Sequence, residues 1–282
     1  MIERPDAGSL RLLVVDPARE ADLRYAAEQL GRLAECRWAE SPSAAIRLLK
    51  EDRPPHWIGL LQSRPGQFDR RVVERLHAAA PLARLFLITG SWSEGETRSG
   101  HPLPGVIRVP WHHLPFALLA ERDAWIAGDP SSWSLPRTAR PVDRLEWRSD
   151  VRLHSQPNEA AAAGGMAEPS SRRRVMILAE QRESFESIAG MCRALDHTGM
   201  WARTPRDVEE SGEPLIWVWG AWSEGGAALA ARWHREAPSL ILADFPRADA
   251  CRDLHASGWH VAGRPISLEY LAAWLGHYPA AR

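Results

Sequence analysis

RLLVVDPAREADLRYAAEQLGRL, residues 11–33, is the stretch that decides the fold. It begins with an apolar run of strand length, after which apolar residues from Leu23 to Leu33 recur at helical spacing. We expect Asp16 to be the N-cap of this helix and Pro17 to be its first residue. A strand followed directly by a helix is the repeating unit of a parallel α/β sheet.

The same alternation continues along the first half of the chain. Crossover connections between parallel strands are right-handed, and their helices cover both faces of the sheet. We therefore expect one doubly wound parallel sheet in residues 1–127. Its further strands are predicted at 36–38, 56–61, 85–89 and 105–109, and its further helices at 41–49, 68–76 and 113–126.

A second cycle of strands and helices follows an interruption. Residues 128–171 are rich in Pro and Ala and are typical of a linker. The expected fold class is thus α/β, with two doubly wound parallel-sheet domains, 1–127 and 172–282, that suggest an internal duplication. In the second domain strands are predicted within 172–180, 214–220, 239–245 and 259–263, and helices at 185–195, 225–238, 247–258 and 267–278, the last capped by Ser267.

Composition excludes several functional classes. The 282 residues carry 35 basic and 36 acidic side chains, and a net charge of −1 gives no argument for binding nucleic acid or an anionic membrane. We find no signal peptide and no apolar run long enough to span a membrane, so a cytoplasmic protein is expected. The 3 scattered cysteines favour a reducing compartment. The 14 tryptophans suggest that some lie at contact surfaces.

Two segments carry a resemblance to a known family. HVAGRPISLEYL (260–271) is similar to a fifth strand that ends in Lys-Pro-Phe and is followed by a helix cap, with Arg264 at the lysine position. LLQSRPG (60–66) is similar to the end of a third strand that carries an aspartate before a Pro-Gly turn, although it is one residue shorter and has Gln62 at the aspartate position. Residues 10–125 and 172–278 thereby resemble response-regulator receiver domains, which have a flavodoxin-like fold.

The resemblance implies a site at the carboxyl ends of the strands. Receiver chemistry needs two acids that hold Mg²⁺, a third carboxylate that accepts the phosphoryl group, a lysine and a switch hydroxyl. In the first half the amide of Gln62 is a poor nucleophile and Val109 carries no charge, and in the second half Gly220 provides no acid. Neither half should therefore perform phosphotransfer, and the chain resembles a tandem of degenerate receivers. The corresponding positions are Asp16, Gln62, Thr89 and Val109 in the first half, and Glu180, Gly220, Asp244 and Arg264 in the second.

A Gly- and Pro-rich segment, GSWSEGETRSGHPLPGV (90–106), follows the predicted fourth strand where a receiver has its fourth helix. Long loops in compact domains are often functional, and exposed Trp and Arg are typical of protein contacts. We expect a recognition loop for another protein. The alternatives are a ligand, metal or peptide site, and a solvated loop in which Glu96 pairs with Arg98. The candidate binding residues are Trp92, Glu94, Glu96, Arg98, His101, Trp111 and His112.

Two further patterns have more than one interpretation. Trp-Ser-Glu-Gly occurs at 92–95 and at 222–225, after the predicted fourth strand of one domain and the third of the other. We expect both copies at a carboxyl edge with the Trp covering the rim of the sheet, and coincidence in a Trp-rich chain is the alternative. Glu180 and Asp244 could form a weak cation site, unless Arg264 pairs with Asp244 instead.

The leading functional hypothesis is a non-enzymatic signalling or scaffold protein that needs no cofactor or metal and acts through unidentified protein partners. The alternative is a protein, even an enzyme, that binds a small molecule, metal or nucleotide in the crevice around residues 90–113. No phosphate-binding glycine motif follows the first strand of either domain, which counts against dinucleotides and nucleoside triphosphates.

Overall fold

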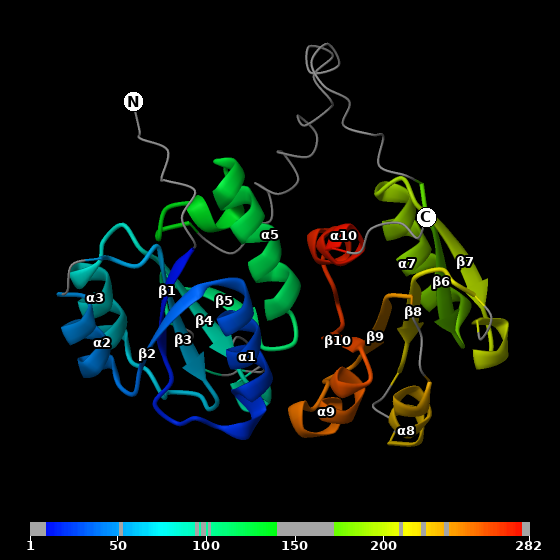
Figure 1. Cartoon of the computed structure of the whole chain (residues 1–282), viewed down its shortest axis with the longest axis horizontal. Coiled ribbons are helices and arrows are strands. Elements are labelled where there is room, and N and C mark those ends of the chain that lie inside the picture. Colours follow the sequence, from blue (N-terminus) through cyan, green and yellow to red (C-terminus); the bar gives the residue numbers. More distant parts are fainter. Residues whose placement is uncertain are drawn as a thin grey trace, which may run out of the picture. The chain divides into compact units, whose positions relative to one another are not determined.

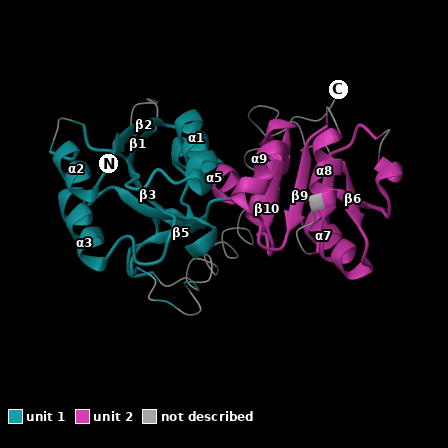
Figure 2. Cartoon of the chain, turned by 90° about the horizontal axis from the view of Figure 1, so that it is seen from below, with its two compact units in different colours: residues 1–111, 118–169 teal, residues 112–117, 170–282 magenta. Residues whose placement is uncertain are grey.

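A computed structural model of the chain describes residues 10–50, 53–93, 96, 100, 103–139, 172–208, 211–220, 224–233 and 237–277. The chain forms two compact units, coloured separately in Figure 2. The first unit contains residues 1–111 and 118–169, and the second contains residues 112–117 and 170–282.

The first unit is built on a five-stranded, all-parallel sheet of order β2-β1-β3-β4-β5. This order is that of doubly wound, flavodoxin-like folds. The central strands β1 and β3 are almost entirely buried, as expected for a parallel sheet covered on both faces. The strands are β1 (Arg11–Val15), β2 (Glu35–Ala39), β3 (Trp57–Gln62), β4 (Arg84–Thr89) and β5 (Ile107–Pro110).

Helices cover both faces of this sheet. Figure 1 shows α2 (Pro42–Leu48) and α3 (Arg70–Ala79) on one face and α1 (Arg24–Leu33) on the other. The face under α2 and α3 buries a continuous apolar core that includes Leu13, Leu60 and Leu87. The final helix, α5 (Leu114–Ala127), belongs to the first unit from Leu118 onward.

Helix starts were predicted with mixed success. Ser41 caps α2 by accepting a hydrogen bond from Ala44 N at 3.1 Å, with Pro42 in the first turn. The N-cap expected at Asp16 is wrong: its Oδ1 accepts from Arg19 N at 2.9 Å within a turn. A 3₁₀ turn, η1 (Ala21–Leu23), follows this turn and precedes α1, so the Asp-Pro pair opens a connection rather than the helix.

The beginning of the predicted linker packs on the first sheet. A 3₁₀ turn, η3 (Ser132–Ser134), carries Trp133, which is only 3% exposed. Its ring centroid lies 5.2 Å from that of Trp57 on β3 and 5.0 Å from that of Phe86 on β4. This aromatic cluster fixes the chain after α5 against the sheet. Residues 140–171 lie outside the described residues.

The second unit repeats the same design. Its five-stranded parallel sheet has the order β10-β9-β8-β6-β7, which is the order of the first sheet when read from β7. The expected fold class, two doubly wound flavodoxin-like parallel sheets, is therefore confirmed. The strands are β6 (Arg174–Ala179), β7 (Thr198–Ala202), β8 (Leu215–Val218), β9 (Ser239–Ala243) and β10 (Trp259–Gly263).

The strand β7 was not predicted from the sequence, because it is short, partly exposed and contains Gly199. The helices match the predicted segments, and Ser267 caps the last one by accepting from Tyr270 N at 3.1 Å. Figure 1 labels them α7 (Arg182–Ala194), α8 (Glu224–Arg232), α9 (Ala248–Ala256) and α10 (Leu268–His277).

All three cysteines are free thiols: Cys192 and Cys251 are buried and Cys36 is half-buried. Burial raises the pKa of Cys36 and of Cys192 to about 11. None of the helices in the described ranges has the length and apolarity that crossing a bilayer requires.

Candidate functional site

The candidate site lies at the carboxyl edge of each sheet, which we define as the edge where the parallel strands end. Doubly wound folds bind their ligands there, beside the point where neighbouring strands connect in opposite directions. In the first unit this point lies between β1 and β3, since β1 pairs with both β2 and β3.

Gln62 ends β3 at this edge and is fully buried. Its Nε2 donates to Glu96 Oε2 at 3.0 Å and lies 3.4 Å from Ser93 Oγ. Its Oε1 is also buried and has no hydrogen-bond partner among the described residues. The residue at the receiver aspartate position thus directs its amide toward a carboxylate of this chain.

Glu96 and Arg108 form a buried ion pair at the same edge. Arg108 Nη1 lies 2.8 Å from Glu96 Oε2, and the side chains are only 17% and 5% exposed. Arg108 Nη2 also lies 3.4 Å from Ser93 O, in the 3₁₀ turn η2 (Ser91–Ser93) that follows β4. Because a buried charge is costly unless it is paired, each member of the pair needs the other.

Sequence reasoning placed Val109 at the lysine position and overlooked its neighbour Arg108. The structure buries Val109, at 4% exposure, and brings the cation to the edge from Arg108. Thr89 ends β4 beside Gln62 in register and is also buried, so the hydroxyl lies at the edge as expected.

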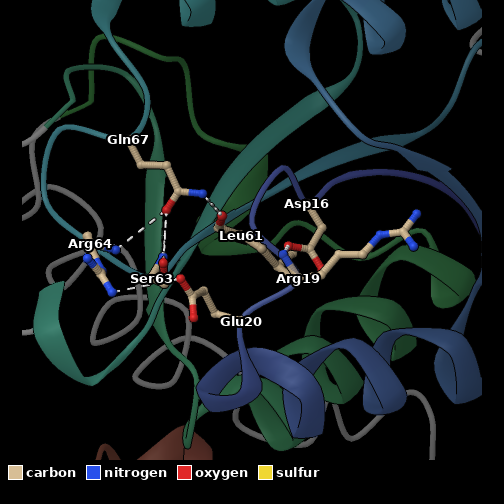
Figure 3. Close-up of polar contacts among 7 residues, drawn as sticks. All are labelled: Asp16, Arg19, Glu20, Leu61, Ser63, Arg64 and Gln67. Carbon is tan, nitrogen blue, oxygen red and sulfur yellow. Dashed lines mark hydrogen bonds and ion pairs between the residues drawn. The ribbon is translucent and has the colours of Figure 1, made fainter.

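The connection from β3 to α3 is held together by hydrogen bonds of the Gln67 side chain (Figure 3). Gln67 Oε1 accepts from the backbone N of Ser63 at 2.9 Å and from Ser63 Oγ at 3.2 Å. Gln67 Nε2 donates to Leu61 O at 3.3 Å. Gly66 has a φ of 75°, a left-handed conformation that suits glycine in this tight turn. The Gln67 side chain therefore occupies the first backbone N–H after the end of β3.

Asp16 lies on the neighbouring β1–α1 connection, and Figure 3 shows it close to Arg19. The hydrogen bond from Arg19 N engages one oxygen of its carboxylate. Glu20 follows and lies 4.0 Å from Arg64 of the β3–α3 connection. These contacts join the two connections on either side of the switch point.

Asp22 is an acid at this edge that sequence reasoning missed. Burial and the nearby Glu20 raise the pKa of its carboxyl, while the backbone N–H of Ser91 partly offsets this effect. A Cβ on Gly90 would collide with Asp22 Oδ2, so the glycine leaves room for the carboxylate. No local pattern marks Asp22, because η1 rather than the first turn after β1 carries it to the edge.

The predicted recognition segment is only partly described. Trp92 lies in η2 and is 78% exposed, so it does not cover the rim of the sheet as expected. Glu94, Arg98 and His101 lie outside the described residues. Glu96 has a helical backbone, and its carbonyl accepts from Gly100 N at 2.8 Å. Its side chain contacts Gln62 and Arg108. The alternative Glu96–Arg98 pair stays a prediction, since Arg98 lies outside the described residues.

Trp111 and His112, the other two candidate binding residues, are buried at 0% and 5% exposure. The Trp111 ring packs edge-on against Tyr25 of α1 in the first unit. In the second unit, His112 Nδ1 accepts a hydrogen bond from Gly263 N at 3.0 Å. Both side chains thus contribute to packing rather than to an exposed surface.

The second unit carries an ion pair at its own carboxyl edge. Arg264 follows β10 and forms two hydrogen bonds with Asp244, which follows β9: Nε to Oδ1 at 3.0 Å and Nη2 to Oδ2 at 2.7 Å. This is the alternative in which Arg264 pairs with Asp244. Glu180 is exposed, and Gly220 offers no side chain at the end of the third strand.

No cluster of three or more His, Cys, Asp or Glu within the described ranges could hold a metal ion. Two of the cavities lined by described residues lie at the carboxyl edges. One of about 430 Å³ lies between the β1–α1 connection and β2, with Arg24 and Trp38 in its wall. The other, of about 310 Å³, lies between α7 and the Asp244–Arg264 pair.

Comparison with known proteins finds similar solved structures, all at low sequence identity to this chain. No protein-family model and no curated protein matches the chain. Among solved structures, a response regulator from Thermotoga maritima is 15% identical with a TM-score of 0.33, covering 39% of this chain and 99% of that one. The E. coli RcsC C-terminus with its phosphoreceiver domain is 14% identical, with a TM-score of 0.34 and coverage of 96% and 94%. D-2-hydroxyisocaproate dehydrogenase is 10% identical, with a TM-score of 0.22 and coverage of 94% of each chain.

Proposed function

We propose that this chain is a cytoplasmic, non-enzymatic signalling or scaffold protein. Its two flavodoxin-like units are degenerate receiver domains that do not accept a phosphoryl group, and they act through contacts with other proteins.

The observation that carries this proposal is the state of Gln62 at the end of β3. Phosphoryl transfer to a receiver needs a carboxylate at this place and free donors for the transferred oxygens. Here an amide stands there, and its nitrogen donates to Glu96 at 3.0 Å. The next backbone N–H, that of Ser63, already donates to Gln67. At the end of β3, therefore, the amide of Gln62 replaces the nucleophile and the first backbone donor is already engaged.

The second unit supports the same conclusion by a different route. Gly220 follows the third strand of this sheet and provides no nucleophile. The cation at the lysine position, Arg264, is neutralised by both carboxylate oxygens of Asp244. A guanidinium held in this way is not available to balance the charge of an acyl phosphate.

The phosphorylation test uses acetyl phosphate and Mg²⁺ with the full chain, and intact-mass spectrometry as the readout. We expect no added phosphoryl group, while a competent receiver domain in the same reaction gains one. A phosphorylated aspartate in this chain would refute the proposal.

The contact surface is supported by two exposed aromatic side chains in corresponding places. Trp92 follows β4, the fourth strand of the first sheet, and Phe245 follows β9, the fourth strand of the second. Each is 78% exposed. Large exposed aromatic residues are characteristic of protein-binding hot spots. Sequence reasoning had singled out Trp92 but not Phe245.

The alternative, a small-molecule, metal or nucleotide site around residues 90–113, stays a prediction. A thermal-shift screen of the full chain against divalent cations and nucleotides tests it. Stabilisation that is lost in Glu94→Ala or Glu96→Ala would favour this alternative over a scaffold.

A further inference from the structure

Three side chains from separate segments meet at the carboxyl edge of the first sheet. Gln62 comes from the end of β3, Arg108 from β5, and Glu96 from the connection between β4 and β5. The Gln62 amide and the Arg108 guanidinium approach the same atom, Glu96 Oε2, at 3.0 and 2.8 Å. The Gln62 amide donates a hydrogen bond to this oxygen, whereas Arg108 Nη1 contacts it as an ion pair without hydrogen-bond geometry.

This arrangement is enclosed. Gln62 is fully buried, and the side chain of Glu96 is only 5% exposed. In such surroundings an arginine without a counter-anion is strongly unfavourable, and a hydrogen bond to a charged group is stronger than one between neutral groups. The buried Arg108 guanidinium therefore requires an anion beside it, and its planar shape suits a carboxylate in particular.

This cluster differs from a simple internal ion pair because some of its buried polar atoms lack hydrogen bonds. Gln62 Oε1 is fully buried and lacks a hydrogen-bond partner in the described part of the chain. Arg108 Nη1 is buried as well and makes no hydrogen bond in the described part of the chain, although it lies 2.8 Å from Glu96 Oε2. A buried guanidinium donor of this kind calls for an acceptor. The contact with Glu96 thus leaves Arg108 Nη1 without the hydrogen bond that a carboxylate in better alignment would accept.

We propose that Gln62 and Arg108 form a binding site for a small carboxylate, and that the chain's own Glu96 is its resident occupant. The enclosure limits an external ligand to the size of formate or acetate. In the wild-type protein Glu96 excludes such an ion because its carboxylate is held at high effective concentration. When the Glu96 carboxylate is removed, formate takes its place between the two donors.

The test is a chemical rescue of the full chain. Thermal unfolding midpoints of wild type, Glu96→Ala and Glu96→Ala/Arg108→Met are measured in chloride, formate, acetate and phosphate at constant ionic strength. We expect Glu96→Ala to unfold at a lower temperature in chloride and to show a saturable rise in its midpoint with formate. The wild type and the double variant should not respond. Glu40→Ala is the matched control, since Glu40 forms an ion pair with Arg19 that is 83% exposed on the glutamate side.

Three results would overturn the proposal. The first is a Glu96→Ala protein that folds and gains nothing from formate or acetate. The second is an equal gain in the double variant, and the third is stabilisation by phosphate without stabilisation by formate. Should Glu96→Ala fail to fold in chloride, the proposal requires it to refold in formate, and failure in both buffers contradicts it.

Discussion

The buried ion pair between Glu96 and Arg108 balances two charges at the carboxyl edge of the first sheet. Its two members lie 12 positions apart, on the connection after β4 and on β5, and both are largely withdrawn from water. The same chain carries an exposed Arg–Glu pair, Arg19 with Glu40, at 3.2 Å. Comparing the two pairs distinguishes the effect of burial on stability from the effect of charge pairing alone.

The substitution Arg108→Met should destabilise the protein by about 3 kcal/mol, because it leaves the Glu96 carboxylate buried without a counter-charge. Arg19→Met should change the stability by about 0.5 kcal/mol or less, since its pair is solvated. Urea unfolding of both variants measures the difference. Equal effects of the two substitutions would show that burial of the pair contributes nothing.

Two histidines of the second unit predict a pH dependence. Burial lowers the pKa of His255 on α9 to about 3. Burial likewise lowers the pKa of His260 on β10 to about 4. Since the folded pKa lies below the unfolded value of 6.5, the unfolded state binds more protons in between. Stability should therefore be complete at neutral pH and fall as the pH drops from 6.5 toward 4.

His260→Phe should make this loss of stability with falling pH smaller, because the ring remains beside Phe116 but can no longer take up a proton in the unfolded state. Urea midpoints recorded across the acidic range give the slope. An unchanged slope in the variant would assign the pH dependence to other groups.

At the residue scale the sequence predicted the strand ends but not the contacts made there. The apolar runs indicated where β3 and β4 end, and Gln62 and Thr89 lie at these ends. The role of Arg108 was hidden, since the resemblance directed attention to Val109, one position further along. The burial of Trp111 could not be foreseen, because it depends on a contact with Tyr25, far away in the sequence.

At the scale of elements, β7 shows how tightly helix and sheet approach one another. A Cβ on Gly199 would lie 2.8 Å from Ile177 Cδ1 of β6 and 3.0 Å from Ala189 Cβ of α7. Close approach of α7 to the sheet therefore requires glycine here. The glycine also interrupts the apolar alternation that marks a strand, so the pairing with β6 is what reveals β7.

Gly199→Ala should destabilise the protein by about 2 kcal/mol through overpacking between α7 and β6. Gly190 of α7 is the matched control, because a Cβ there would lie 3.8 Å from its nearest neighbour, Arg193 Nη2. Gly190→Ala should stabilise the helix by about 1 kcal/mol or less. Thermal unfolding distinguishes the two, and a neutral Gly199→Ala would contradict the close approach.

At the scale of the whole molecule, the two parallel sheets were predictable from the alternation of strands and helices, whereas their strand order was expected only from the resemblance and β7 was missed. The equivalent placement of Trp92 and Phe245 was not predictable, since the two residues share no sequence motif. Their equivalence appears only when both follow the fourth strand of their sheets.

Affinity purification from cell extract should recover fewer specific partners with Trp92→Ala or Phe245→Ala bait than with wild type, because each substitution removes an exposed aromatic anchor. Leu82→Ala is the matched control: Leu82 is 96% exposed but precedes β4, at the opposite edge of the first sheet. Undiminished recovery with both aromatic variants, quantified by mass spectrometry, would remove the case for a contact surface at the carboxyl edges.

The raised pKa values of the three native thiols have a practical consequence for spectroscopy. Thiol-directed reagents attack the thiolate, and a pKa of about 11 for Cys36 and Cys192 leaves little of it at neutral pH. Cys251 is buried, and its pKa is raised still further. A cysteine introduced at position 92 would therefore react first, so that a single fluorophore or spin label could report on that position without prior removal of the natural cysteines.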